Sequence, residues 1–236
     1  MKLCILDNDN LDTNLAPRFH SFGRMFMGLF EAAGADWSYE VFNTTRGEYP
    51  QSFDAFDAVL LTGSHADAFS DAPWVVELRR QVTQLLEQHK KMVGVCFGHQ
   101  LIGLCMGARV GRAPQGWGAG RMTYDWHRND LPYFENASQV ALLASHQDQV
   151  LELPKGATLV ASSDFCPVAA FTVGNDVFCI QPHPEFVEDF SAYLLNKRRA
   201  VLGEEKVVTG LASLEKGHEG TRVARLMVDF LEPPVR

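Results

Sequence analysis

The sequence predicts an α/β fold in which helices cover both faces of a mostly parallel sheet. Through the first hundred residues, short apolar segments typical of strands alternate with longer segments of helical periodicity. That alternation favours parallel strands joined by helices. The 236 residues are 46% hydrophobic and 21% charged, which is ordinary for a globular protein and leaves enough chain for a large core. We therefore expect a single domain that spans residues 1–236.

The first half of the chain supplies the parallel part of this sheet. Apolar runs of strand length predict strands at residues 2–6, 37–42, 58–61 and 92–95. Helical spacing predicts helices at residues 18–33, followed by Gly34, and at residues 73–89, which begin with Pro73. A strand–helix unit thus opens the chain.

The second half is richer in β-structure. Glycines and aromatic residues punctuate residues 111–133, and residues 140–144 and 158–161 are typical of strands. Residues 168–173 and 177–181 predict a hairpin around a two-residue turn, Gly174-Asn175. Helices are expected at residues 187–201 and 222–231. The pattern predicts a small antiparallel β region in addition to the parallel sheet.

Composition narrows the classes of partner. The net charge is −8, and no cluster of Lys and Arg is dense enough to neutralise a run of phosphates, which argues against a nucleic-acid partner. The N-terminal segment is unlike a signal peptide, and no apolar stretch approaches the roughly 20 residues that cross a bilayer. We expect a cytoplasmic protein without a membrane partner.

The cysteines and histidines predict neither a disulfide framework nor a metal site. There are five cysteines, an odd number, with no Cys-x-x-Cys pair. Cys4, Cys105 and Cys179 have apolar neighbours typical of core positions, whereas the sequence around Cys166 indicates no role. The histidines lack metal-ligand spacing, and no phosphate-binding glycine-rich loop is present, so we expect no metal and no cofactor.

A candidate nucleophile lies within residues 92–102, which predict a strand, a sharp turn and a helix, with Cys96 at the turn. Gly94 and Gly98 flank it, and glycine lets neighbouring backbone approach where a Cβ would clash. A thiol at the N-terminus of a helix is favoured as the reactive thiolate. The N–H of Phe97 can point at a developing oxyanion. This spacing favours a catalytic cysteine over a core cysteine.

A candidate base follows the last expected strand, in Gln181-Pro182-His183-Pro184-Glu185. A nucleophilic thiol needs a base, and the base needs a group that orients it. Two prolines stiffen the backbone around His183, and Glu185 can hold one ring nitrogen while the other faces sulfur. In isolation, such a segment also fits a surface turn.

Both segments resemble known motifs. Gly94-Val95-Cys96-Phe97-Gly98-His99-Gln100 resembles the nucleophile elbow of class I glutamine amidotransferases, and residues 183–185 resemble the His-Pro-Glu signature of that family. The resemblance covers roughly residues 2–190. It implies a flavodoxin-like sheet with Cys96 as nucleophile, His183 as general base and acid, and Glu185 as orienting carboxylate at the carboxyl edge of the sheet.

The resemblance also implies a substrate site. Gly63, in Thr62-Gly63-Ser64, is similar to the second oxyanion donor of the family, and Phe97 to the first. Gln100 matches a glutamine that helps to bind the substrate amino acid. Gln147 and Asp148 lie in a stretch that resembles the family segment facing the α-amino and α-carboxylate groups of the substrate. The chain departs from the family pattern at His65, where a proline is missing, and at Gln147, which replaces a glycine.

Three other features allow simpler interpretations. His146 fits a structural histidine as well as a site residue, and Trp117 and Trp126 fit core packing as well as a pocket wall. The acid-rich residues 7–12 are expected to form a solvated turn.

The implied reaction is hydrolysis of the γ-glutamyl amide of glutamine or of another γ-glutamyl compound, through a γ-glutamyl thioester on Cys96. Residues 62–74 look more like stand-alone relatives of the GMP synthase amidotransferase domain, among them plant γ-glutamyl peptidases, than like synthetase-bound domains. One alternative is a glutaminase subunit that passes ammonia to a separate synthetase partner. Another is a non-catalytic regulatory module on the same fold. The substrate would be a small molecule, and the oligomeric state, including a homodimer, stays open.

Overall fold

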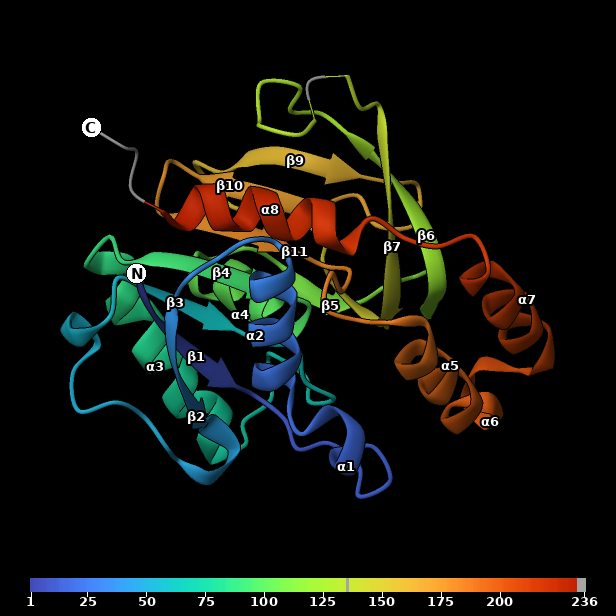
Figure 1. The fold of residues 1–236 in the computed structure, drawn as a ribbon, viewed down its shortest axis with the longest axis horizontal. Coiled ribbons are helices and arrows are strands. Elements are labelled where there is room, and N and C mark those ends of the chain that lie inside the picture. Colours follow the sequence, from blue (N-terminus) through green and yellow to red (C-terminus); the bar gives the residue numbers. More distant parts are fainter. Residues whose placement is uncertain (135, 233–236) are drawn as a thin grey trace.

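The computed structural model describes residues 1–134 and 136–232. Within them, a nine-stranded mixed sheet runs in the order β2-β1-β3-β4-β11-β10-β9-β6-β7 (Figure 1). The strands are β1 (Lys2–Asp7), β2 (Ser38–Asn43), β3 (Ala58–Leu61), β4 (Lys91–Val95), β6 (Gly118–Trp126), β7 (Gln139–His146), β9 (Thr158–Ser162), β10 (Ala170–Val173) and β11 (Val177–Ile180). A separate antiparallel pair joins β5 (Val110–Arg112) to β8 (Asp148–Val150).

The helices are α1 (Ala16–Phe19), α2 (Phe22–Ala32), α3 (Pro73–Glu87), α4 (Phe97–Cys105), α5 (Glu188–Lys197), α6 (Arg199–Leu202), α7 (Glu204–Leu214) and α8 (Gly220–Leu231), with short 3₁₀ turns η1 (Thr44–Arg46) and η2 (Phe53–Ala55). In the described ranges, no helix combines the length and hydropathy needed to cross a bilayer.

Strands β2, β1, β3, β4 and β11 pair in parallel, and their alternating side chains feed two cores. Leu3 and Ile5 of β1 point toward α2 and α8, whereas Cys4 and Leu6 point toward α3 and α4. Because successive side chains of a strand face opposite sides of a sheet, this alternation requires helices on both faces. The predicted α/β fold with helices on both faces is confirmed.

Antiparallel strands extend the same sheet beyond β11. Strands β10, β9, β6 and β7 pair antiparallel in turn, and α5 and α7 pack against β6 (Figure 1). Phe186, Phe190 and Leu195 belong to a third apolar cluster that includes Leu143 of β7 and Val207 of α7. The antiparallel region is therefore continuous with the parallel sheet, apart from the small β5–β8 pair.

Two local predictions were wrong, and one helix was missed. The helix expected at residues 18–33 is split because His20 has φ 61°, and Ser21 starts α2 by accepting a hydrogen bond from the N–H of Arg24. The hairpin loop has three residues, since Val173 pairs with Val177. Helix α7 was missed because Gly210 interrupts its apolar pattern; that glycine is needed where α7 meets Leu195, whose Cδ2 would lie 2.7 Å from an added Cβ.

Candidate active site

Cys96 lies at the elbow between β4 and α4. Its φ of 52° and ψ of −102° belong to a strained backbone region that L-residues rarely adopt. Glycines allow the elbow to pack: a Cβ on Gly94 would lie 2.7 Å from the carbonyl oxygen of Gly98, and a Cβ on Gly98 would lie 2.5 Å from that of Leu61. The strained residue is held by a hydrogen bond from its N–H to the carbonyl of Ile180, at 2.9 Å. The elbow predicted from glycine spacing is present.

Phe97 begins α4 directly after the candidate nucleophile. The first N–H groups of a helix have no intrahelical acceptor, so the Phe97 N–H is available at the Cys96 side chain. The Phe97 ring is buried and packs against Trp74, with ring centroids 5.6 Å apart. Packing of the ring holds the start of α4, and with it the N–H of Phe97, in place, as an oxyanion donor would require.

His183 follows β11 and is held from three sides. Its N–H donates to the carbonyl of Leu143 at 2.8 Å, and its ring Nδ1 lies 2.7 Å from Glu185 Oε1. The ring stacks on Phe186, with centroids 3.8 Å apart and planes 10° apart. Nδ1–H donating to Glu185 leaves Nε2 for Cys96.

The charges around His183 favour its protonated form. Burial by itself lowers the pKa, but Glu185 and Cys96, through their charges and hydrogen bonds, outweigh burial and raise the pKa of His183 to about 10. The four other cysteines have raised pKa values because burial disfavours their thiolates; Cys4 and Cys166 reach about 12. Cys96 differs from these four in that it lies beside the His183–Glu185 pair.

Glu185 is completely buried as a side chain. The segment that carries it rests on the start of α8, where Gly220 lies so close to the carbonyl of Pro184 that no Cβ would fit. Glu219, just before this helix, ties it to β7 through hydrogen bonds with the backbone of Ala141, each 2.8 Å long. The carboxylate beside His183 is thus fixed by packing from an element more than thirty residues away.

Gly63 lets the loop after β3 pack against Cys96 and His183. A Cβ at this position would lie 2.8 Å from His183 Cε1 and 3.6 Å from the Cβ of Cys96. The loop is held by Asn8, whose Nδ2 donates to the carbonyl of Thr62 at 3.0 Å and whose N–H donates to Thr62 Oγ1 at 2.9 Å. Only glycine leaves room for the imidazole here.

The expectation of a solvated turn at residues 7–12 was wrong for its first half. Asp7, Asn8 and Asp9 are buried. Asp9 accepts from the N–H of His65 at 2.8 Å and pairs with its ring Nδ1 at 2.7 Å, while Asp7 accepts from the N–H of Gly23 at 3.0 Å. Asp9 therefore holds the loop after β3 and Asp7 holds the start of α2, because short carboxylates satisfy backbone N–H groups at strand and helix ends.

A first cavity, the Cys96 pocket, has a volume of about 150 Å³. It is lined by Ser64, His65, Ala66, Asp67, Cys96, Gln100, Arg112, Trp117, Ser145, His146, Gln147, Asp148 and Arg198. Gln100 is buried in its wall, where Nε2 donates to the carbonyl of Asp148 at 2.8 Å and to Gln181 Oε1 at 3.1 Å. The wall is therefore rigid and polar.

An ion network closes one side of this pocket. Arg112 pairs with Asp148 at 2.6 Å and with Asp67 at 3.0 Å. Burial raises the pKa of Asp148 although Arg112 opposes the shift. Gln147 is half-buried, and its carbonyl accepts from the N–H of Ala113 at 2.8 Å. With two carboxylates around one guanidinium, this side attracts a cation such as an ammonium group.

His146 and Trp117 also line the Cys96 pocket. Burial and the charge of His183 lower the pKa of His146 to about 3, so its ring is neutral. Trp126, by contrast, packs in the core on Phe134, with ring centroids 4.0 Å apart. The pocket-wall interpretation therefore holds for Trp117 and the core interpretation for Trp126.

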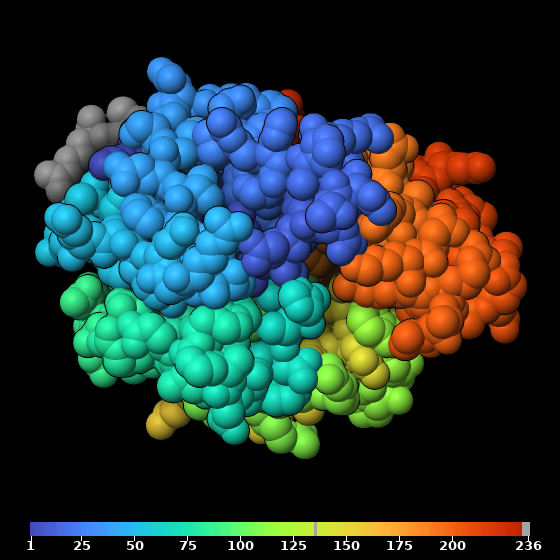
Figure 2. Space-filling model, turned by 90° about the horizontal axis from the view of Figure 1, so that it is seen from below, coloured from blue at the N-terminus to red at the C-terminus, as the bar shows by residue number. Residues whose placement is uncertain are grey.

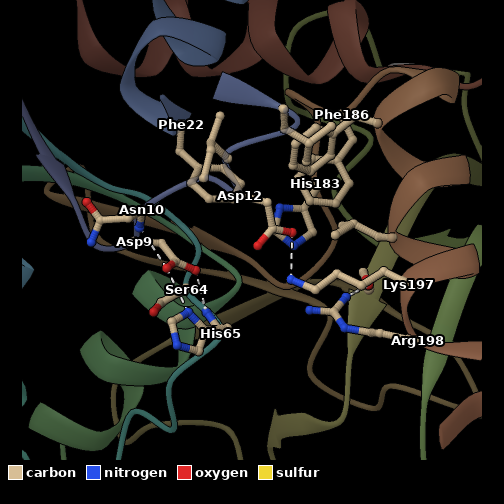
Figure 3. Close-up of a pocket in the computed structure, with 15 residues that line it drawn as sticks. Asp9, Asn10, Asp12, Phe22, Ser64, His65, His183, Phe186, Lys197 and Arg198 are labelled. Atoms are coloured by element: carbon tan, nitrogen blue, oxygen red, sulfur yellow. Dashed lines mark hydrogen bonds and ion pairs between the residues drawn. The ribbon is translucent and has the colours of Figure 1, made fainter. Parts of the chain in front are cut away.

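A second cavity of about 220 Å³, the His183 pocket, adjoins the first and shares Ser64, His65, Ser145 and Arg198 with it. It is lined by Asp9, Asn10, Leu11, Asp12, Leu15, Phe22, Ser64, His65, Ser145, His183, Phe186, Phe190, Leu194, Lys197 and Arg198 (Figure 3). Figure 2 shows the surface hollowed where the N-terminal segment, the loop after β3 and α5 meet. At the opening of this pocket, Lys197 Nζ forms an ion pair with Asp12 Oδ2 at 2.6 Å.

The structure brings all eight residues expected for the site into one region: Gly63, Cys96, Phe97, Gln100, Gln147, Asp148, His183 and Glu185. Sequence reasoning missed the residues of the His183 pocket, above all Asp9, Phe186, Lys197 and Arg198. Phe186 directly follows the His-Pro-Glu segment, and that position was the one signal available. Among residues 1–134 and 136–232, no three or more His, Cys, Asp or Glu side chains are grouped so as to hold a metal ion.

Comparisons with known proteins agree with this arrangement. Residues 29–197 match the family model described as glutamine amidotransferase class-I. The chain is 36% identical over 176 residues to γ-glutamyl peptidase 3 of Arabidopsis thaliana, a match that covers 71% of this chain and 70% of the relative. It is 32% identical over 145 residues to a glutamine-hydrolysing GMP synthase subunit of Methanocaldococcus jannaschii, a match that covers 61% and 72%.

A solved glutamine amidotransferase from Thermotoga maritima superposes with a TM-score of 0.78 at 18% identity, over 99% of both chains. The predicted flavodoxin-like fold and the predicted amidotransferase-like hydrolase are confirmed. The chain belongs to the class I glutamine amidotransferase family.

Proposed function

We propose that the protein hydrolyses γ-glutamyl amide bonds of small peptides through a γ-glutamyl thioester on Cys96. His183 Nε2 accepts the thiol proton, and the sulfur attacks the γ-carbonyl carbon. The N–H groups of Gly63 and Phe97 stabilise the resulting oxyanion. His183 then donates its proton to the leaving nitrogen as the C–N bond breaks, which leaves the thioester and a free amine.

The second half of the reaction uses the same groups. His183 takes a proton from water, and the water oxygen attacks the thioester carbon. Collapse of this intermediate breaks the C–S bond, releases glutamate and returns the proton to sulfur. Glu185 keeps the imidazole in one tautomer and stabilises its charge throughout. The carboxylates of Asp67 and Asp148 offer partners for the α-amino group of the glutamyl half.

The observation that carries the proposal is the His183 pocket. The general acid must face the leaving group, and here His183 faces a cavity of about 220 Å³. Release of ammonia alone needs no such space. The 36% identity to a protein named γ-glutamyl peptidase supports the same conclusion.

A second candidate is a glutaminase subunit that supplies ammonia to a synthetase partner. The similarity to a relative named as a GMP synthase subunit favours it. In that case the His183 pocket would be covered by the partner rather than filled by a leaving group. We further propose that residues 1–236 form a single domain, which the uninterrupted nine-stranded sheet supports.

Turnover by the purified protein separates the two candidates. Glutamate release is measured from glutamine and from a series of γ-glutamyl dipeptides, with Cys96→Ala as the blank. A peptidase cleaves the dipeptides with kcat/KM well above the value for glutamine. If only glutamine is hydrolysed, or nothing is hydrolysed by the protein alone, the peptidase proposal fails and the second candidate gains support.

A further inference from the structure

Arg198 occupies the boundary between the two cavities. It is the last-turn residue that links α5 to α6, and its backbone is fixed by hydrogen bonds to Leu194 and Leu202. Its side chain lines both the Cys96 pocket and the His183 pocket. Ser64, His65 and Ser145 also line both. In Figure 3 its guanidinium lies beside Lys197 at the edge of the His183 pocket.

The charge of Arg198 is not matched by a carboxylate among the described residues. Its Nη1 donates to Ser145 Oγ, and the guanidinium lies over the Trp117 ring, 5.0 Å from the centroid. Burial lowers the pKa of Arg198, and the more distant charges of Cys96, Asp9 and Asp12 oppose that shift. A half-buried cation held only by a hydroxyl and a ring favours the binding of an anion, because an anion offsets the cost of burying its charge.

The other charged groups of the His183 pocket are already paired. Asp9 is bound to His65, and Asp12 to Lys197. By contrast, the neighbouring Arg199 lies outside the pocket and pairs with Glu204 at 2.5 Å. Among the described residues of this pocket, Arg198 is thus the cation whose charge is not paired with a carboxylate.

The position of Arg198 indicates which anion it holds, and this step rests on the proposed function. In a γ-glutamyl amino acid, one carbon separates the scissile nitrogen from the α-carboxylate of the leaving residue. A cation at the boundary between the cavities of Cys96 and His183 is close to the scissile bond. Guanidinium donors match a carboxylate in geometry and charge.

One wall of the His183 pocket is apolar. Phe22, Phe186 and Phe190 form a packed aromatic group with ring centroids 4.6 to 6.4 Å apart, and Leu194 adds to the same wall. We propose that Arg198 binds the α-carboxylate of the leaving residue and that this aromatic wall receives its side chain. The preferred substrates are then γ-glutamyl dipeptides whose second residue is apolar.

The test compares two substrates that differ only in the carboxylate: γ-glutamyl-leucine and γ-glutamyl-isopentylamide. The wild-type protein should prefer the dipeptide in kcat/KM. Arg198→Met should reduce this preference by about 10- to 100-fold, the range for a charge-assisted hydrogen bond. Arg198→Lys should restore part of the preference, and Arg199→Met is the matched control that keeps it. Because the readout is a ratio within one protein sample, partial misfolding cancels.

The outcomes separate the two proposals. If both substrates are cleaved but Arg198→Met leaves their ratio unchanged, Arg198 either holds the glutamyl half or only packs, and the inference is overturned while the proposed function stands. If the wild-type protein cleaves neither substrate, the proposed function fails and the inference falls with it. Equal kcat/KM values for γ-glutamyl-leucine and γ-glutamylglycine would contradict the role of the aromatic wall, for which we expect a preference of about 10-fold or more.

Discussion

The two pockets that meet at Cys96 and His183 are built differently. The Cys96 pocket takes much of its wall from the elbow and from residues 145–148, and internal hydrogen bonds and ion pairs hold that wall in place. The His183 pocket joins N-terminal residues to α5 across the molecule, and aromatic rings line it. In the proposed reaction, acyl transfer and the choice of leaving group therefore use separate parts of the chain.

The largest effect should come from the group on which both halves of the proposed reaction depend. Cys96→Ala removes the nucleophile, so kcat should fall by about 10⁴-fold or more for every substrate, whatever its leaving group. Glutamate release under saturating substrate measures this. Cys105→Ala, at the far end of the same helix, is the matched control and should keep its activity. Residual turnover by Cys96→Ala near the wild-type rate would mean that another group starts the reaction.

The next largest effect tests the orientation of His183. Glu185→Gln keeps the shape but removes the charge that holds Nδ1–H, and kcat should fall by about 10²- to 10⁴-fold. Both substrate classes should be affected alike, because the dyad serves both pockets. Glu188→Gln, three residues on in the first turn of α5, is the control. A loss confined to KM would place Glu185 in substrate binding instead.

The effect of Gly63→Ala should be steric rather than electrostatic. The added Cβ would lie 2.8 Å from His183 Cε1, so either the imidazole or the loop after β3 must shift. We expect kcat to fall by about 10²-fold. Gly28→Ala is the control, since nothing lies within 4 Å of an added Cβ there. Normal kcat in Gly63→Ala would show that the loop does not supply an oxyanion donor.

The smallest effect concerns stability and pH. The pKa of folded His183 is raised to about 10, above an unfolded value of about 6.5. Its contribution to stability is complete below about pH 6.5 and is lost as the pH rises toward 10. Wild type should therefore lose more stability over this interval than Glu185→Gln, in which the pKa of His183 is lower. Urea unfolding midpoints at both ends of the interval check this, and equal losses would contradict it.

The contrast between the two pockets also explains which features the sequence could predict. The elbow, the His-Pro-Glu segment and the strand–helix alternation are local patterns, and each led to a correct position. The role of Asp9 was missed because its partner, His65, lies 56 residues away. Arg198 was missed for a similar reason: it meets Ser145 and Trp117 only after α5 has packed on the sheet. Helix α7 was missed because it contains Gly210, a residue that disfavours helices but is needed there for close packing against Leu195.

The central claim is a covalent γ-glutamyl intermediate on Cys96, and acid quenching during turnover tests it most directly. The protein is mixed with γ-glutamyl-leucine, quenched within the first turnovers, digested and analysed by mass spectrometry. We predict a mass increase of one glutamyl group on the peptide that contains Cys96, absent from Cys96→Ala and discharged on longer incubation. Turnover without an adduct on any cysteine, or an adduct on another cysteine alone, would contradict a thioester mechanism at Cys96.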